Sequence, residues 1–593
     1  MEPESAVAST RDSHSLARQT IERALRVLLQ TRTRAGSLRC PVHRTEHLGK
    51  SAYLLRCAGA LTMEEERSLA LHLSRALRPH PEQPEVFVFG PGASDARNLA
   101  SHAIDSASVA AALAAHLARG NDDSEVRSAL QRCARSYLVP LAATKRIPAQ
   151  RAWALWGLAE AAAVLREEPL RDAALRGLAA VLRSVRSDGG ILYDESDRPR
   201  GTGSASAFYH SRVVGFAWLA ACALGDEELL PRETLLAAAR WLAFLLFADG
   251  AKAARPEAKP WYFPGAMEDA SAPFDLLLLV PAALRGRDAE LARLARARLA
   301  RHAACFEASG AVHAGIEHGE AFQCASFFAA HALLLAEIDE PTWRVLDALA
   351  KQRTPTATPV SEGAWELRGA CDGDAAAKLA RWRSAELDAL FVLERGSAGP
   401  LHGAEAGGVL VAFARASTPT QSVPCLRENP PGFRWRGTRP ARVDLSELRF
   451  ALHLLRMPSG TRGARGGVFA RWARFRSYLR SVRVRRAGWI LASDAVLRAA
   501  SASDRRVELR WRAVDAHGAE IAGLELRRTI VATRLGLVCR ETLTLESGVA
   551  LRELSFALPH GAELRRGSLR ASSISGPRRV IVRYRLLVPQ RAE

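Results

Sequence analysis

Apolar residues recur with a helical period along the middle of the chain, from Asp105 to about Glu394. Two stretches, 152–159 and 213–220, are apolar around most of the helix circumference, which is typical of helices enclosed by other helices. The pattern predicts helices at Asp105–Arg119, Asp123–Tyr137, Ala149–Arg166, Leu170–Arg186, Ser206–Leu224, Arg232–Phe247, Ser271–Leu284, Asp288–Phe306, Phe322–Ile338, Thr342–Lys351 and Asp374–Glu394.

Three long polar loops, Ser187–Ala207, Asp249–Ala270 and Glu307–Ala321, interrupt these helices at nearly constant spacing. The connections between them are short, and helices joined by tight turns run antiparallel, so all three loops fall at one end of the array. A repeated helix pair with one long loop predicts a ring of helical hairpins, the (α/α) toroid; an open solenoid is the alternative. In either arrangement we expect the functional site at the loop end.

The pattern changes after Gly396, where short segments rich in β-branched and aromatic residues follow one another. In 506–512, charged residues alternate with Val, Leu and Trp, so one face of that strand meets water. An antiparallel β-sandwich that packs against the helices is predicted. Its expected strands are Gly407–Ala416, Arg449–Leu455, Ser481–Arg486, Trp489–Leu497, Arg506–Val514, Leu524–Val531, Leu537–Leu545 and Arg579–Val588.

The first hundred residues are mixed. Helices are expected at Ser15–Gln30 and Met63–Leu77, and the apolar segments Ala52–Cys57 and Glu85–Gly90 are strand-like. The chain is therefore predicted to be a multidomain α+β protein. Its predicted parts are a small mixed region (1–104), an (α/α) toroid (105–395) and a C-terminal antiparallel β-sandwich (396–593).

The first long loop leads into a helix whose opening turn holds Tyr209, His210 and Arg212. A phenol and an imidazole can transfer protons, and a guanidinium can hold an anion. Alternatively, these side chains cap the helix and hydrogen-bond to carboxylates of the loop. The segment before the helix at Ala149 falls at the same end, and Arg151 is its candidate anion contact.

The other two loops supply further candidates. Trp261 and Tyr262, between two prolines, form a stiff aromatic platform on which sugar rings can stack, or a hydrophobic staple that fixes the loop. In the third loop, acid/base or substrate contact, metal ligation and a structural hydrogen-bond network are all open readings. The His-x₃-Glu-His spacing there matches no standard zinc site, so no metal is predicted. The third-loop candidates are His313, Glu317, His318 and Gln323.

The 593-residue chain has a formal net charge of +20, from 83 Lys and Arg against 63 Asp and Glu. This excess indicates either polyanionic partners or a GC-rich coding bias that places Ala and Arg on helix surfaces. Nucleotide-binding, nucleophile-elbow, helix-turn-helix and RNA-binding motifs are missing, so neither a cofactor nor a nucleic-acid partner is expected. The nine cysteines are scattered, and no signal-peptide or membrane-spanning pattern occurs. A cytoplasmic location is expected.

From about Asp105 to the C-terminus, the predicted architecture, with Asp188-Gly-Gly and Tyr209-His210, resembles the heparinase II/III-like and alginate lyase polysaccharide lyases. In that family a Tyr and a His at the toroid rim abstract the proton α to a uronate carboxylate and protonate the leaving oxygen. The resemblance implies these roles for Tyr209 and His210, with Arg212 as the anion contact and His318 as a second candidate base. The family's His-rich stretch at the start of the sandwich is represented only by 402–405.

The sequence therefore predicts a polysaccharide-lyase-like enzyme (a carbon–oxygen lyase) that cleaves or modifies a uronic-acid-containing glycan by proton abstraction at C5, with an acidic polysaccharide or oligosaccharide as its partner. Two alternatives of different class stay open: a non-catalytic glycan-binding or assembly protein, and a glycoside hydrolase that uses two carboxylates of the loop end. The candidate carboxylates are Asp188, Asp194, Glu195, Glu268, Asp269, Glu317 and Glu320.

Overall fold

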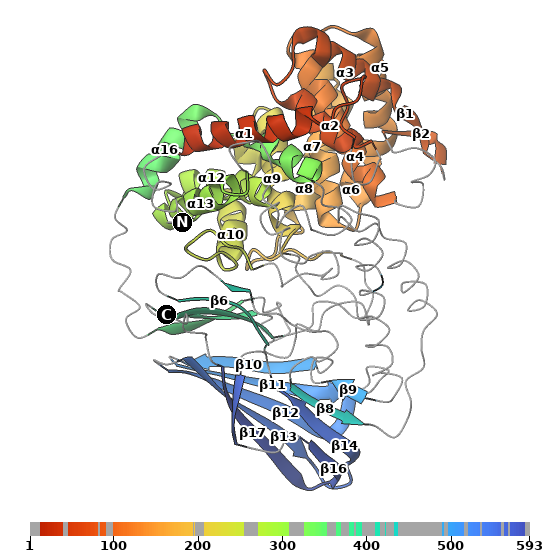
Figure 1. Cartoon of the computed structure of the whole chain (residues 1–593). Coiled ribbons are helices and arrows are strands. Elements are labelled where there is room, and N and C mark those ends of the chain that lie inside the picture. The colour runs from red at the N-terminus through yellow and green to blue at the C-terminus, as the bar shows by residue number, and fades with distance from the viewer. Residues whose placement is uncertain are drawn as a thin grey trace.

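A computed structural model describes much of the chain. The described residues are 12–39, 46–80, 83–89, 99–193, 195, 207–253, 271–306, 325–352, 363–368, 379–384, 387–393, 409–415, 421–422, 432–436, 472, 489–491, 496–503, 505–514, 520–533, 536–558, 562–566 and 570–586. Within them, helices dominate up to residue 352, and strands make up the remainder from residue 364 (Figure 1). None of the described helices is long and apolar enough to span a membrane.

The helical part also contains one short hairpin, β1 (Leu77–His80) with β2 (Gln83–Phe89). Short π-helical and 3₁₀ segments lie at Ala134–Leu138, Glu227–Leu229 and Leu333–Glu337. The α-helices are α1 (Ser13–Leu29), α2 (Leu48–Arg56), α3 (Met63–Arg75), α4 (Leu99–Ala118), α5 (Ser124–Cys133), α6 (Val139–Thr144), α7 (Pro148–Leu165), α8 (Glu168–Leu182), α9 (His210–Ala223), α10 (Arg232–Ala243), α12 (Ala272–Gly286), α13 (Ala289–Ala303), α15 (Ala325–Ala332) and α16 (Glu340–Ala350).

The helices predicted between Asp105 and Lys351 are confirmed, with shifts at their ends. Two local predictions were wrong. Ala52–Cys57, predicted as strand-like, lies mostly in α2, whereas the helix predicted at Asp374–Glu394 is replaced by two strands, β4 (Leu379–Arg383) and β5 (Leu387–Val392). A helix and a strand that are buried on all sides both read as short apolar runs, so periodicity cannot separate them.

Contacts among the described helices form a closed series. It runs from α2 to α4, α7, α9 and α12, then to the 3₁₀ segment Leu333–Glu337, which with α15 contacts α2 again. A second layer packs outside this series: α8 lies against α7 and α9, and α10 against α9 and α12. Gly157 lets α7 approach α4 closely, because a Cβ there would lie 2.6 Å from the carbonyl oxygen of Ala107.

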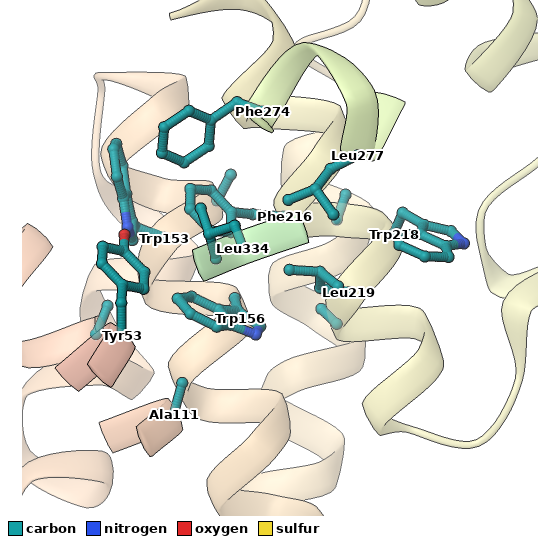
Figure 2. Packing of buried hydrophobic residues seen from close by; sticks show 14 of the residues in the cluster. Tyr53, Ala111, Trp153, Trp156, Phe216, Trp218, Leu219, Phe274, Leu277 and Leu334 are labelled. Atoms are coloured by element: carbon teal, nitrogen blue, oxygen red, sulfur yellow. The ribbon is translucent and has the colours of Figure 1, made fainter. Parts of the chain in front are cut away.

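Aromatic side chains fill the space that the inner helices enclose (Figure 2). Trp156 stacks on Phe216 with ring centroids 4.9 Å apart, and Tyr53 lies 6.4 Å from Trp156. Beside them, half-buried Arg56 donates from Nη2 to Glu160 and from Nε to Glu337, each at 2.5 Å. This ion cluster joins α2, α7 and the 3₁₀ segment, and so connects the beginning of the closed series to its end.

All strand pairs are antiparallel in the three sheets that follow. The five-stranded sheet has the order β3-β4-β5-β6-β7, the six-stranded sheet β10-β11-β12-β13-β17-β15, and the four-stranded sheet β16-β14-β8-β9. Side chains from all three sheets share one hydrophobic cluster. The remaining strands are β3 (Ala364–Arg368), β6 (Val409–Arg415), β7 (Gln421–Ser422), β8 (Gly432–Arg436), β9 (Trp489–Leu491), β10 (Val496–Ser503), β11 (Arg506–Val514), β12 (Glu520–Thr533), β13 (Gly536–Leu545), β14 (Ala550–Ala557), β15 (Ala562–Arg566), β16 (Arg570–Ser575) and β17 (Arg578–Leu586).

These sheets confirm a mixed α and β fold with antiparallel β-structure. The predicted strands at Arg506–Val514, Leu524–Val531 and Leu537–Leu545 are present. Those at Arg449–Leu455 and Ser481–Arg486 lie outside the described residues. The first strand of the five-stranded sheet begins at Ala364, inside the range 105–395 that was predicted to be helical.

Arg381 of β4 anchors the five-stranded sheet to the helices. Its buried guanidinium binds Asp388 and donates to the carbonyl oxygens of Phe244 and, at 2.9 Å, Leu246, just after the end of α10. Leu379 and Leu390 of the sheet share a buried cluster with side chains that follow α10. Figure 1 shows this sheet between the helices and the six-stranded sheet. The loop end of the helices therefore faces β-structure.

Candidate functional site

The two outer helices α8 and α10 are each followed by the same tight turn. A β-bridge closes each turn, Val185 with Ile191 in the first and Leu246 with Lys252 in the second. In each, an aspartate side chain accepts a hydrogen bond from the backbone N–H two residues further on, at 2.8 Å for Asp188 and 3.0 Å for Asp249. These turns open the first and second long loops, so both loops start from rigid, equivalent positions.

A glycine in each turn presses against the next outer helix. Gly189 and Gly250 have φ of 82° and 79°. A Cβ at Gly189 would lie 2.0 Å from the carbonyl oxygen of Ala237, and one at Gly250 would lie 2.3 Å from that of Ala297. Both the positive φ and the close approach require glycine here. The contact fixes the carbonyl of Gly189 in front of α9.

His210 is the first residue of α9 and is buried behind the first loop, with 1% of its surface exposed. Its Nε2 lies 2.9 Å from the carbonyl oxygen of Gly189; because a carbonyl can only accept, Nε2 carries the proton. The ring stacks on Trp241 at a centroid distance of 4.2 Å. Burial lowers the pKa of His210 to about 4, so the imidazole is neutral at pH 7.

Tyr209 precedes α9 and is only half-buried. Its ring lies 5.5 Å from that of Tyr193 in the first loop and 4.9 Å from that of Phe208. The guanidinium carbon of Arg212 lies 5.5 Å from the Tyr209 ring centre. Tyr209 therefore presents a phenol close to a cation at the start of a buried helix.

Arg212 itself is 1% exposed. Its guanidinium carbon lies 3.6 Å from the ring centre of Phe208 and 3.9 Å from that of Phe274, and it donates to the carbonyl oxygen of Phe208. Aromatic faces attract cations, most strongly away from water. These contacts hold a fixed positive charge beneath Tyr209.

Three charged residues form a buried cluster beside this arginine. Asp275 of α12 binds Lys252 through Oδ1 at 2.7 Å and Arg298 of α13 through Oδ2 at 3.0 Å. Ser271 donates to the same carboxylate at 3.2 Å. Burial lowers the pKa of Lys252 to about 8, against the attraction of Asp275. Burial alone would raise the pKa of Asp275, but the two cations more than offset it and the pKa is lowered. The cluster ties the second loop to α12 and α13.

Arg151 of α7 holds the first loop in a similar way. Its Nη1 and Nη2 donate to the two carboxylate oxygens of Glu195, at 3.0 and 3.1 Å, and Nη2 also donates to Ser184. The Arg151 side chain is therefore engaged in a bidentate ion pair that joins α7 to the loop. A role in substrate binding stays a prediction.

The structure brings Tyr209, His210 and Arg212 together at the start of α9, as the sequence predicted, and places Arg151 on neighbouring α7. The other predicted site residues lie outside the described residues. They are Trp261, Tyr262, His313, Glu317, His318 and Gln323.

Several residues around this site were missed. Asp275 and Arg298 belong to the buried cluster, and Lys50 of α2 donates to Nε2 of His331 at 3.0 Å among the inner aromatic rings. Phe274 contacts both Arg212 and His331. The sequence signal that could have identified these residues is a charged residue within an otherwise apolar stretch, as at Lys50 and Asp275. Buried charges need partners, which sequence alone does not identify.

No protein-family model matches the chain, and no curated protein matches it. Among solved structures, a tyrosine-to-alanine mutant of Chondroitin AC Lyase from Streptomyces coelicolor A3 is similar at 13% identity and a TM-score of 0.47, over 97% of this chain and 76% of that one. A heparinase III is similar at 8% identity and a TM-score of 0.38, over 80% of this chain and 66% of that one. Both are polysaccharide lyases, the class that the sequence motifs resemble.

The type II terpene cyclase MstE from Scytonema, in complex with geranylgeranyl dihydroxybenzoate, is also similar. Its identity is 13% and its TM-score 0.33, over 56% of this chain and 98% of that one.

Proposed function

We propose that this protein is a lyase-like enzyme that acts on a uronic-acid-containing glycan, built as an (α/α) toroid followed by an antiparallel β-sandwich. The closed series of helix contacts supports the toroid, and the cluster shared by the three sheets supports the sandwich. The observation that carries the function is the half-buried side chain of Tyr209 with the buried Arg212 guanidinium 5.5 Å from its ring.

In the proposed reaction, Tyr209 acts as a phenolate, takes the proton from C5 of the uronate and becomes a neutral phenol. The electron pair then forms the C4–C5 double bond as the C4–O bond breaks, and the leaving oxygen takes up the proton from the Tyr209 phenol, which restores the phenolate. Negative charge accumulates near the uronate carboxylate in the transition state. A fixed cation in a water-poor site stabilises such charge by several kcal/mol, because it needs no reorganisation during the reaction. Arg212, held between Phe208 and Phe274, supplies this field.

His210 is assigned to positioning. Its neutral imidazole binds the Gly189 carbonyl and stacks on Trp241, which fixes the start of the first loop next to Tyr209. The direct proton transfer implied by the family resemblance stays a prediction for His210, as does the role of His318 as a second base. The partner class, an acidic polysaccharide or oligosaccharide, is part of the proposal.

The hydrolase alternative gains no support from the described carboxylates of the loop end. Asp188 accepts from the Gly190 N–H, Glu195 is paired with Arg151, and Asp275 is enclosed by Lys252 and Arg298. Each is committed to holding a turn, a loop or a helix. The remaining candidates, Asp194, Glu268, Asp269, Glu317 and Glu320, lie outside the described residues.

A panel of uronate polysaccharides tests the proposal. Turnover is followed by ultraviolet absorbance of the unsaturated uronate and by release of reducing ends. We expect both signals to rise together and to be lost in Tyr209→Phe. Tyr137→Phe, which removes a hydroxyl in the π-helical turn after α5, is the matched control and should keep activity. Reducing ends without absorbance would support hydrolysis, and binding without either signal would support the non-catalytic alternative.

A further inference from the structure

One face of the six-stranded sheet is crowded with arginine. Side chains alternate along its strands: the face with Leu509, Leu526 and Leu543 belongs to the hydrophobic cluster shared by the sheets. On β11, β12, β13 and β17, the opposite face carries eight arginines against two glutamates, Glu508 and Glu525. We call it the arginine face; its arginines are Arg506, Arg510, Arg512, Arg527, Arg540, Arg579, Arg583 and Arg585.

Two arginine pairs on this face stand in direct cross-strand register. Arg510 on β11 is opposite Arg527 on β12, and Arg540 on β13 is opposite Arg583 on β17. Like charges directly opposite each other destabilise a sheet. Arg527 is balanced by Glu508. Within the described parts of the chain, Arg510, Arg540 and Arg583 have no salt bridge, so the repulsion between Arg540 and Arg583 is not compensated there.

These four arginines form a band across neighbouring strands. With a spacing of about 4.8 Å between strands, a row with one arginine on each of four strands extends roughly 14 Å. Arg510 and Arg583 are exposed, and Arg527 and Arg540 are half-buried. An extended chain with repeated negative charges matches this row better than a single small anion does.

The other side chains on the face distinguish between kinds of polyanion. Between the arginines on β11, β12, β13 and β17 lie Thr529, Thr542, Thr544, Val531, Val538 and Ile581. These four strands place no aromatic side chain on this face. Proteins that bind single-stranded nucleic acid stack bases on aromatic side chains, a contact that these strands do not offer. A flat cationic surface without a stacking platform favours a partner that is recognised by charge alone.

We propose that the arginine face binds an acidic glycan chain through its carboxylate or sulfate groups, as a second contact surface remote from Tyr209. The surface follows from the sheet itself, whereas the choice of a glycan among polyanions rests on the proposed function. Figure 1 shows the five-stranded sheet between the helices, α9 among them, and the six-stranded sheet. A short oligosaccharide at Tyr209 therefore does not reach the arginine face, but a long polymer can contact both.

Binding of the intact protein to polymers tests this proposal. The probes are heparin and alginate, with uncharged dextran and single-stranded DNA as comparisons, each at several salt concentrations. The test variant is Arg540→Gln with Arg583→Gln. Its control, Arg176→Gln with Arg183→Gln, removes the same charge from two exposed positions, one on α8 and one directly after its end. Thermal unfolding checks that both variants fold.

We expect the test variant to bind heparin or alginate about two- to thirtyfold more weakly at low salt, because two charge contacts at the sheet surface are lost. Its binding should also depend less on salt, since fewer counterions are exchanged. The control variant should bind like the wild type. Equal loss in both variants, or no loss in the test variant, would overturn the proposal. Tighter binding of DNA than of either acidic glycan would reject the glycan as occupant.

The turnover assay separates this proposal from the enzyme proposal. Both variants should cleave a short uronate oligosaccharide at the wild-type rate. If no glycan is turned over but the test variant binds heparin more weakly, the enzyme proposal fails and the arginine face stands. If turnover occurs and the test variant binds both acidic polymers like the wild type, the arginine face is wrong and the enzyme proposal stands.

Discussion

Acid should destabilise this protein through His210. Burial lowers the pKa of this imidazole to about 4, from its usual 6.5. Between these values the unfolded chain binds a proton at His210 and the folded chain does not. The free energy of unfolding therefore falls as the pH drops from 6.5 to 4, and the contribution of His210 is fully present above pH 6.5. The pKa difference corresponds to about 3 kcal/mol, a large share of the roughly 5–15 kcal/mol that stabilises a typical protein.

His210→Gln isolates this effect. The glutamine amide can replace Nε2 as donor to the Gly189 carbonyl, but it does not titrate. We propose urea unfolding of both proteins at several pH values between 7 and 4. The packing cost of the substitution is the same at each pH and cancels in the comparison, as does the titration of the carboxylates.

The wild type should lose about 3 kcal/mol more than His210→Gln over this range. Parallel pH dependences of the two unfolding free energies would refute the reasoning, because they would mean that burial does not lower the pKa of His210 in the folded protein.

Two further predictions concern buried charge clusters. Asp275→Asn leaves the cations of Lys252 and Arg298 buried without their shared anion, so the free energy of unfolding in urea should drop by about 3–5 kcal/mol. Lys252→Met keeps the Asp275–Arg298 pair and should lower this free energy by less. A larger loss of unfolding free energy in Lys252→Met than in Asp275→Asn would contradict the central place of the Asp275 carboxylate in the cluster. Arg56→Met leaves Glu160 and Glu337, whose side chains are each only 16% exposed, without their cation, and should also cost about 3–5 kcal/mol. The control Arg18→Met, at an exposed position, should stay within about 0.5 kcal/mol of the wild type. Equal urea midpoints for the two arginine variants would contradict the role of Arg56 in joining α2 to the end of the helix series.

The helices could be predicted because their apolar positions repeat with helical spacing over many turns. Where an apolar run is short and buried on all sides, the same signal was ambiguous. Leu48–Leu55 is almost wholly buried in a helix, and Leu379–Trp382 is wholly buried in a strand. Only packing against neighbouring elements decides between the two conformations in such segments.

The core of the candidate site could be predicted because Tyr209, His210 and Arg212 are adjacent in the chain and follow a long loop. Their surroundings could not be predicted, since the partners come from distant segments. The contacts of Lys252 with Asp275, and of Asp275 with Arg298, each span 23 residues, and Arg381 reaches Leu246 across 135. Such pairs are set by tertiary packing, and a charged residue in an apolar helix signals only that a partner exists.

The mass of the reaction products tests the central claim most directly. A uronate oligosaccharide that the protein cleaves should be digested in H₂¹⁸O, and both product ends examined by mass spectrometry. Elimination predicts a new non-reducing end that is lighter by one water than the hydrolysis product, with no ¹⁸O introduced by bond cleavage, and neither product in Tyr209→Phe. Products with a saturated uronate and ¹⁸O at the cleaved bond would contradict C5 proton abstraction by Tyr209.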